Sequence, residues 1–292
     1  MRSRSAGFVV ITGIYATAAL LAISVFLALP HTHIFWRLLV ADVAATIWVY
    51  LIGIPLKNAS VYDPYWSMAP LVVVTPFAFK STESELGLCL FLLAVWYWGI
   101  RLTCNWAHTF TSLTKEDWRY ARFRTHYPQL FQIISLFGIN LFPTAVVYLC
   151  LLPGVVFLQG STCNALTLIG FTVCVGSTTL QLVADRQMHR FRHKNAGGNQ
   201  IIRHGLWKHS RHPNYLGEIL MWWGVYCFLL STAPKKWYLM LGALINTLMF
   251  VFISIPMADK RNLRERPGFE QCVRQTRILL PLAVRKTSEP PR

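Results

Sequence analysis

Charge is scarce in this sequence of 292 residues. Asp, Glu, Lys and Arg make up 14% of it and hydrophobic residues 54%, whereas soluble domains carry about 25% charged residues. Negative charge is scarcer still, because 12 Asp and Glu face 28 Lys and Arg and leave a formal net charge of +16. This composition excludes an ordinary soluble domain and favours a polytopic membrane protein.

Several familiar patterns are also absent. The seven cysteines form no C-x-x-C pair and most lie in apolar runs, so we expect neither a disulfide framework nor a structural zinc site. His189 and His193 have the i, i+4 spacing of a helical metal pair, but no acidic third ligand lies nearby on that face, and we expect no metal. No helix-turn-helix or zinc-finger spacing accompanies the basic charge, which argues against nucleic-acid binding.

What the sequence does have is apolar runs that could cross about 30 Å of hydrocarbon, which takes about 20 helical residues. There are eight of them: Gly7–Leu29, Phe35–Leu56, Ser60–Phe79, Leu86–Cys104, Ile133–Phe157, Asn164–Ala184, Tyr215–Ser231 and Trp237–Met257. The third contains three prolines, and we keep it because neighbouring helices can satisfy the backbone groups that a kink frees. The sequence therefore predicts an all-α transmembrane bundle of about eight (seven to eight) spans.

The distribution of cations predicts the orientation of this bundle. With eight spans both chain ends share one side of the membrane, and that side receives 24 of the 28 Lys and Arg residues. The positive-inside rule then places both termini in the cytoplasm. We expect an integral membrane protein of the endoplasmic reticulum in a eukaryote or of the inner membrane in a bacterium, with its cytoplasmic cations in contact with membrane lipids.

Polar residues near the ends of two spans need another explanation. Arg101 and Asn105 share one face of a helix by i, i+4 spacing, and Asp185 shares a face with Arg192 two turns later. Arg101 and Arg192 could simply extend to the headgroups, but Asn105 and Asp185 are too short for that. An ionisable residue within a span indicates a functional site.

A second polar group opens the span that begins near residue 213, in the stretch "SRHPNYLGE". Pro213 suits the first turn of a helix, so Asn214 and Glu218 lie on one face with Tyr215 beside them. Helix N-termini attract anions, and Arg211 and His212 add positive charge there. The arrangement suits a ligand with phosphates at one end and an uncharged polar head, such as a carboxamide or a sugar, at the other.

These residues stand in a series of motifs that resembles the steroid 5-alpha-reductase superfamily, and most closely its branch with D-P-x-W and R-H-P-N-Y-x-G-E elements. The resemblance covers roughly Val61–Pro281. It rests on "VYDPYWSM", "GIRLTCNWAHTF", "EDWRYARFR", "ADRQMHRFRHKN", "HGLWKHSRHPNYLGEILMWWG" and "RPGFEQCVRQTRILLP". It divides the chain into N-terminal transmembrane helices (1–60), a reductase-like membrane domain (61–281) and a basic C-terminal tail (282–292).

The resemblance implies a membrane-embedded, NADPH-dependent reductase that saturates a carbon–carbon double bond conjugated to a carbonyl in a lipid-like substrate. NADPH would then lie within the helical bundle near the cytoplasmic face, which agrees with the lack of a G-x-G-x-x-G motif after a predicted strand. Carried over residue by residue, the cofactor positions are Arg101, Asn105, Asp185, Arg192, Arg211, His212, Asn214, Tyr215 and Glu218.

The resemblance also suggests the catalytic groups. It places an acidic residue at the position of Asp63, and a reductase needs a donor that stabilises the enolate forming on the carbonyl oxygen. We therefore expect Asp63 and a tyrosine, Tyr62, Tyr65 or Tyr97, to contact that oxygen. Burial would keep an aspartic acid neutral and able to donate at neutral pH. The alternative for Asp63 is a capping role before an interfacial aromatic pair.

Two other functions stay open. Isoprenylcysteine and phospholipid methyltransferases carry a similar R-H-P-x-Y string, so an S-adenosylmethionine-dependent methyltransferase is the first alternative. A non-enzymatic lipid-binding protein is the second.

Overall fold

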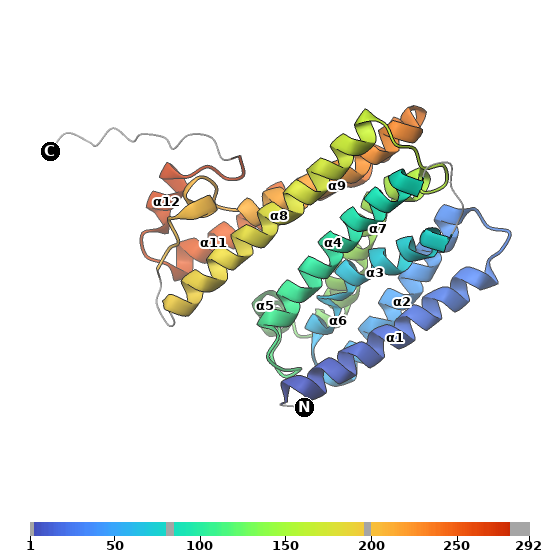
Figure 1. Cartoon of the computed structure of the whole chain (residues 1–292). Coiled ribbons are helices and arrows are strands. Elements are labelled where there is room, and N and C mark those ends of the chain that lie inside the picture. Colours follow the sequence, from blue (N-terminus) through green and yellow to red (C-terminus); the bar gives the residue numbers. More distant parts are fainter. Residues whose placement is uncertain (1–2, 80–84, 196–199, 281–292) are drawn as a thin grey trace. The chain divides into compact units, whose positions relative to one another are not determined.

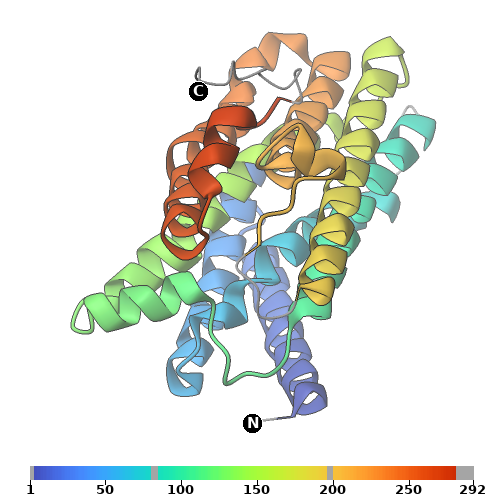
Figure 2. The same ribbon diagram turned by 90° about the vertical axis from the view of Figure 1, so that its left-hand side faces the viewer.

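A computed structural model gives the structure of the chain and describes residues 3–79, 85–195 and 200–280. It is 82% helix and has no strands in these residues, apart from a single bridge between Ser210 and Arg277. The expected all-α class is confirmed. The chain divides into two compact units, Met1–Thr162 and Cys163–Arg292, and each is described by itself (Figures 1 and 2).

The first unit contains the three predicted catalytic residues, Asp63, Tyr65 and Tyr97. Its elements are α1 (Arg4–Ala28), α2 (Ile34–Leu56), η1 (Ala59–Tyr62), α3 (Tyr65–Val74), η2 (Thr75–Phe79), α4 (Glu85–Thr109), α5 (Trp118–His126), α6 (Phe131–Ile133), the π-helical η3 (Ile134–Leu141) and α7 (Phe142–Phe157). The long helices α1 and α2 pack against each other as an antiparallel pair (Figure 1).

The turn after α2 sends the chain back into this unit. Lys57 ends the helix in a left-handed conformation, with φ of 51°, and the side chain of Asn58 caps η1 by accepting a hydrogen bond from the Ser60 amide. Pro64 then precedes α3, which is 10 residues long, or about 15 Å. Tyr62 and Tyr65 are thereby buried among residues of α1 and α2.

The second unit contains the R-H-P-N-Y-x-G-E stretch. Its elements are α8 (Ala165–Lys194), η4 (Gly205–Lys208), α9 (Pro213–Thr232), η5 (Pro234–Met240), α10 (Leu241–Met249), the π-helical η6 (Phe250–Ser254), α11 (Ile255–Glu265) and α12 (Phe269–Gln275). Helices α8 and α9 pack along their length. Gly217 permits this close approach, because a Cβ there would lie 2.6 Å from the Ser177 carbonyl oxygen and 2.4 Å from Gln181 Cγ, and small residues are what let helices meet so closely.

Six helical segments among the described residues are long and apolar enough to cross a membrane: Arg4–Ala28, Ile34–Leu56, Glu85–Thr109, Phe131–Phe157, Ala165–Lys194 and Pro234–Glu265. They match six of the eight predicted runs and support an integral membrane protein. The third predicted run is instead broken into η1, α3 and η2. The seventh forms the 20-residue α9, which begins with polar residues that lower its mean hydropathy.

Candidate functional site

The motif that begins α9 is built into the second unit by an ion pair. Asp259 of α11 accepts a hydrogen bond from the Arg211 guanidinium and another from the His212 ring, each at 2.9 Å. Arg211 also donates to the carbonyl oxygens of Val273 and Thr276, at 3.1 and 2.7 Å. Both motif side chains are buried. In the structure, Arg211 and His212 therefore hold α9, α11 and the segment after α12 together.

The next residues of the motif face α8. Asn214 donates from Nδ2 to Oδ1 of Asp185 at 3.3 Å, so the structure brings together two of the predicted cofactor residues that are 29 positions apart. Tyr215 stacks on the ring of His212, with centroids 5.1 Å apart and planes 6° apart. An amide, a carboxyl group and a phenol thus gather at the first turn of a 20-residue helix, where the backbone also favours negatively charged ligand groups.

Glu218 lies one turn further along α9 and is buried, with 5% of its surface exposed. Its Oε1 accepts a hydrogen bond from the indole Nε1 of Trp222 at 3.0 Å. A buried carboxyl group needs such donors.

A cluster of cations lies at the C-terminal end of α8 and in α11. Burial lowers the pKa of Arg266, and the neighbouring charges of Arg192 and Arg261 lower it further. Glu265 pairs with Arg261 at 2.7 Å and with Arg264 at 3.1 Å. Among the described residues, Glu265 forms no ion pair with Arg192 or Arg266. Sequence analysis predicted Arg192 as a cofactor-binding residue. The structure adds Arg261 and Arg266, which come from a distant part of the chain, to the same cluster.

In the first unit, Asp63 lies between η1 and α3 and is partly buried. It accepts a hydrogen bond from the hydroxyl group of Tyr120 in α5 at 2.8 Å. Burial raises the pKa of Asp63 to about 7, although the charge of Arg119 acts in the opposite direction. The carboxyl group is thus partly protonated at neutral pH, as the catalytic hypothesis requires, but its described tyrosine partner is not one of the three predicted.

The predicted tyrosines have other partners. Tyr65 donates to Oδ1 of Asp42 in α2 at 2.7 Å, and Tyr62 shares a 2.8 Å hydrogen bond with Thr144. Tyr97 lies on α4 with Arg101 and Asn105, and their spacing of four places the three on one helical face. Arg101 is buried and the other two are partly buried. The structure confirms the helical register of these residues, and their roles stay predictions.

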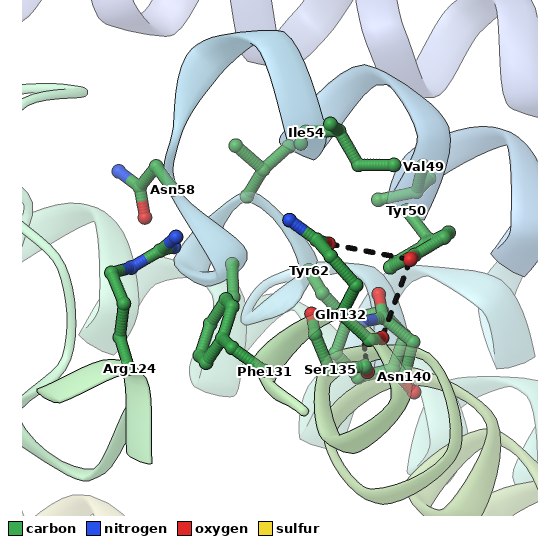
Figure 3. A pocket seen from close by; sticks show the side chains of 13 residues that line it. Val49, Tyr50, Ile54, Asn58, Tyr62, Arg124, Phe131, Gln132, Ser135 and Asn140 are labelled. Carbon is green, nitrogen blue, oxygen red and sulfur yellow. Dashed lines mark hydrogen bonds between the residues drawn. The ribbon is translucent and has the colours of Figure 1, made fainter. Parts of the chain in front are cut away.

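A pocket lies where α2, η1, α5, α6 and η3 meet. Figure 3 shows Arg124, Asn58 and Tyr62 among the side chains around it. The guanidinium of Arg124 lies 3.9 Å from the centroid of the Phe131 ring, and Tyr50 donates to Gln132 at 3.3 Å. Sequence analysis did not predict this pocket, whose polar side chains come from five separate elements.

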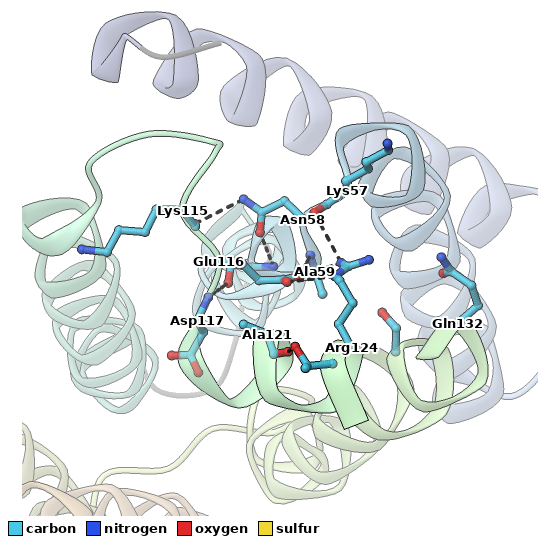
Figure 4. Close-up of polar contacts among 12 residues, drawn as sticks. Lys57, Asn58, Ala59, Lys115, Glu116, Asp117, Ala121, Arg124 and Gln132 are labelled. Atoms are coloured by element: carbon cyan, nitrogen blue, oxygen red, sulfur yellow. Dashed lines mark hydrogen bonds and ion pairs between the residues drawn. The ribbon is translucent and has the colours of Figure 1, made fainter. Parts of the chain in front are cut away.

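Glu116 holds the turn beside this pocket in place (Figure 4). Its carboxylate accepts hydrogen bonds from Arg124, at 2.8 and 3.1 Å, and from the Ala59 amide at 2.8 Å. Asn58 meanwhile donates to the Leu113 carbonyl at 2.6 Å. These contacts attach the segment before α5 to the start of η1, and they fix the backbone from which Asp63 projects.

Two acidic residues at these sites were missed by sequence analysis. Asp42 lies inside a predicted span, and an ionisable residue at that depth was itself a signal for function. Asp259 follows the last predicted span and carried no such signal, because its partners Arg211 and His212 lie 48 and 47 residues away. Only the folded chain joins them.

The fold and these polar contacts define an all-helical integral membrane protein with a polar site at the start of α9. The chain belongs to the family described as "Protein of unknown function (DUF1295)", which matches residues 49–276. An uncharacterised protein of Schizosaccharomyces pombe is 26% identical over 200 residues, which span 59% of this chain and 58% of that relative's length. No solved structure matches.

Proposed function

We propose that this protein is a membrane-embedded, NADPH-dependent reductase that saturates a carbon–carbon double bond conjugated to a carbonyl in a lipid-like substrate. The hydrogen bond between Asn214 and Asp185, with buried Glu218 one turn further along α9, supports this proposal most directly. These groups supply both donors and acceptors for a carboxamide or a ribose. The resemblance to the steroid 5-alpha-reductase superfamily supplies the reaction class.

The cations of the second unit suit the phosphates of the same cofactor. Arg192, Arg261 and Arg266 lie close enough for their charges to affect one another, while Glu265 is the carboxylate paired with Arg261. Guanidinium groups bind phosphates through paired N–H donors. The donor set therefore fits the 2′-phosphate and pyrophosphate of NADPH better than it fits S-adenosylmethionine, which has no phosphate.

The proposed reaction requires one chemical contribution from the protein's own side chains, a hydrogen-bond donor to the substrate. NADPH, when bound, supplies a hydride to the β-carbon of the substrate. The protein must then offer a donor to the carbonyl oxygen, on which negative charge develops. Asp63, Tyr65 and Tyr97 remain the candidates for this role. The raised pKa of Asp63 supports it as a donor, since a carboxyl group that keeps its proton near pH 7 can donate a hydrogen bond.

The eight-span topology belongs to the same proposal. In it, α9 and the segment Ser60–Phe79 cross the membrane together with the six long apolar helices, and both termini face the cytoplasm. The distribution of 24 of the 28 cations supports this orientation. The cofactor residues at the start of α9 then lie near the cytoplasmic face, where NADPH is available.

Direct binding separates the proposal from its two alternatives. Purified full-length protein in detergent should bind NADPH in a fluorescence titration and show a thermal shift that grows with NADPH concentration. Stabilisation by S-adenosylmethionine, together with transfer of a radiolabelled methyl group to lipid, would instead support the methyltransferase. A protein that binds lipid but neither cofactor would support the non-enzymatic alternative.

Preference for NADPH over NADH tests the cationic cluster specifically. Replacing Arg266 by Gln removes one guanidinium, and loss of a charged hydrogen bond weakens binding by about 10- to 150-fold. Arg266→Gln should therefore lose most of the preference for NADPH over NADH. Arg264→Gln is the matched control, because its side chain is 57% exposed and pairs with Glu265. Equal loss in both variants would exclude a specific phosphate site at Arg266.

A further inference from the structure

Asp42 places a carboxyl group inside a membrane-spanning helix. It is the ninth residue of α2 (Ile34–Leu56), about 12 Å along the helix from Ile34 at a rise of about 1.5 Å per residue. Within the described ranges 3–79, 85–195 and 200–280, no ion pair involves it. A carboxyl group without an ion-pair partner at this depth is costly to keep and indicates a function.

The side chain of Asp42 also lines a narrow, mainly aliphatic pocket between α2, α3 and α7. Tyr148 contributes the other polar group of the wall, a hydroxyl group that donates to the Phe35 carbonyl at 2.7 Å. The remaining wall consists of Leu, Ala, Pro and Val side chains. Asp42 is therefore the polar group of this wall that is placed to contact a ligand.

The hydrogen bond to Tyr65 defines what Asp42 can offer. Within hydrocarbon the charged form of a carboxyl group is costly, and this favours its neutral form. The hydroxyl group of Tyr65 donates to Oδ1 of Asp42 at 2.7 Å. In its neutral form, Asp42 keeps its acid proton as one further donor. A pocket with aliphatic walls and one O–H donor suits an apolar molecule that carries a hydrogen-bond acceptor.

We propose that the pocket between α2, α3 and α7 binds the carbonyl group of a lipid ketone, and that Asp42, positioned by Tyr65, donates the hydrogen bond that selects it. This inference rests on the proposed function for its substrate class. Asp42 precedes the region 49–276 that the family matches, whereas Tyr65 lies within it. Asp42 would therefore determine specificity from outside the family region, and Tyr65 would position it from within that region.

Depth favours a ketone over the ester carbonyl of a phospholipid. Ester groups lie in the interfacial region outside the hydrocarbon core of about 30 Å. With α2 spanning from Ile34, Asp42 lies about 12 Å further in. A phospholipid would have to pull its headgroup into hydrocarbon to reach it. A lipid that lies wholly within the core brings its carbonyl to this depth without that cost.

Photolabelling of the full-length protein in nanodiscs tests the inference without any nucleotide. The probes are a long-chain methyl ketone with a diazirine and an alkyne, the same chain as an alkane, and the same chain as a phosphatidylcholine ester. The ketone probe should label α2, α3 or α7 more strongly than the alkane. Asp42→Leu should reduce this ketone-to-alkane ratio by about 2- to 12-fold, as expected for one lost hydrogen bond.

Three further variants separate the loss of a hydrogen bond from a general disturbance of the fold. Asp42→Asn retains an N–H donor and should keep most of the ketone preference. Tyr65→Phe should lose part of it, whereas Tyr50→Phe, which removes a hydroxyl group of α2 that donates to Gln132, should not.

The proposal is overturned if Asp42→Leu keeps the ketone preference, if labelling maps outside these three helices, or if the ester probe labels them as strongly as the ketone. NADPH binding is measured separately, so its failure would count against the reductase and not against this pocket.

Discussion

Two aspartates show how differently the two units treat a carboxyl group. Asp259 in the second unit accepts hydrogen bonds from Arg211 and His212, both at 2.9 Å. Asp42 in the first unit accepts one from the neutral hydroxyl group of Tyr65. A carboxylate with a buried cation as partner is fixed as an anion and ties elements together. A carboxyl group with neutral partners can exchange one of them for a ligand.

The surroundings of the two residues repeat this contrast. In the first unit, hydroxyl groups contact one another around Asp42, as in the 2.9 Å contact between Thr46 and Thr144 and the 2.8 Å contact between Tyr62 and Thr144. In the second unit, guanidinium groups contact carboxylates and backbone carbonyls. The first arrangement suits recognition of an uncharged lipid, and the second suits structural anchoring and phosphate binding.

The largest effect is expected from breaking the ion pair of Asp259. Asp259→Ala leaves Arg211 buried without its carboxylate, and loss of one partner of a buried pair costs about 3–5 kcal/mol of unfolding free energy. Unfolding of the purified protein in detergent, monitored by tryptophan fluorescence, measures this change. Glu265→Ala is the matched control on the same helix, because its pairs are 38–57% exposed on the Arg side and should cost no more than about 1 kcal/mol. Equal effects of the two substitutions would contradict a structural role for Asp259.

The next effect concerns ligand binding by the second unit. Glu218→Gln keeps the shape of the side chain and can still accept from Trp222, but it loses the charge. We expect NADPH affinity to fall by about 10- to 150-fold, the cost of one charged hydrogen bond, with little change in the unfolding transition. Isothermal titration of folded protein measures the affinity, and Glu270→Gln, an exposed carboxylate of α12, is the control. Affinity within twofold of wild type for Glu218→Gln would remove this residue from the proposed site.

Local patterns in the sequence predicted the parts of the fold that local physics decides. Six apolar runs form the long helices, because length and hydropathy along one segment are enough to specify a span. Spacing of four predicted that Asn214 and Glu218 share a helical face. The same spacing also relates Glu218 to Trp222, so their hydrogen bond was visible in the sequence and was missed.

Contacts between distant segments could not be predicted in this way. The partner of Tyr65 is Asp42 rather than the nearby Asp63, because the turn through η1 brings α3 back against α2. Asp63 instead meets Tyr120, which lies 57 positions away in α5. Such pairs depend on how helices pack, and a single sequence carries no periodic signal for that. The third predicted span failed to form one helix for a local reason, since Pro64 and Pro76 each interrupt the backbone hydrogen bonds of the run.

The smallest effect concerns the pH dependence of the first unit. The folded state raises the pKa of Asp63 from 3.8 to about 7, so the folded protein holds a proton that the unfolded chain releases. Its contribution to stability is complete below about pH 4 and is lost as the pH rises through 7. Between about pH 6 and about pH 8 the loss should be about 1.4 kcal/mol, because the folded carboxyl group is on average half protonated across that range.

Subtracting the profile of Asp63→Asn isolates this contribution from the titration of the histidines. The difference between wild type and variant should slope downward with rising pH, and the slope should flatten above about pH 8, where the folded carboxyl group is also ionised. Glu270→Gln is the control, because Glu270 is an exposed carboxylate of α12. Parallel profiles for wild type and Asp63→Asn would mean that Asp63 is ionised throughout. The carboxyl group could then no longer serve as the neutral donor that the proposed reductase needs.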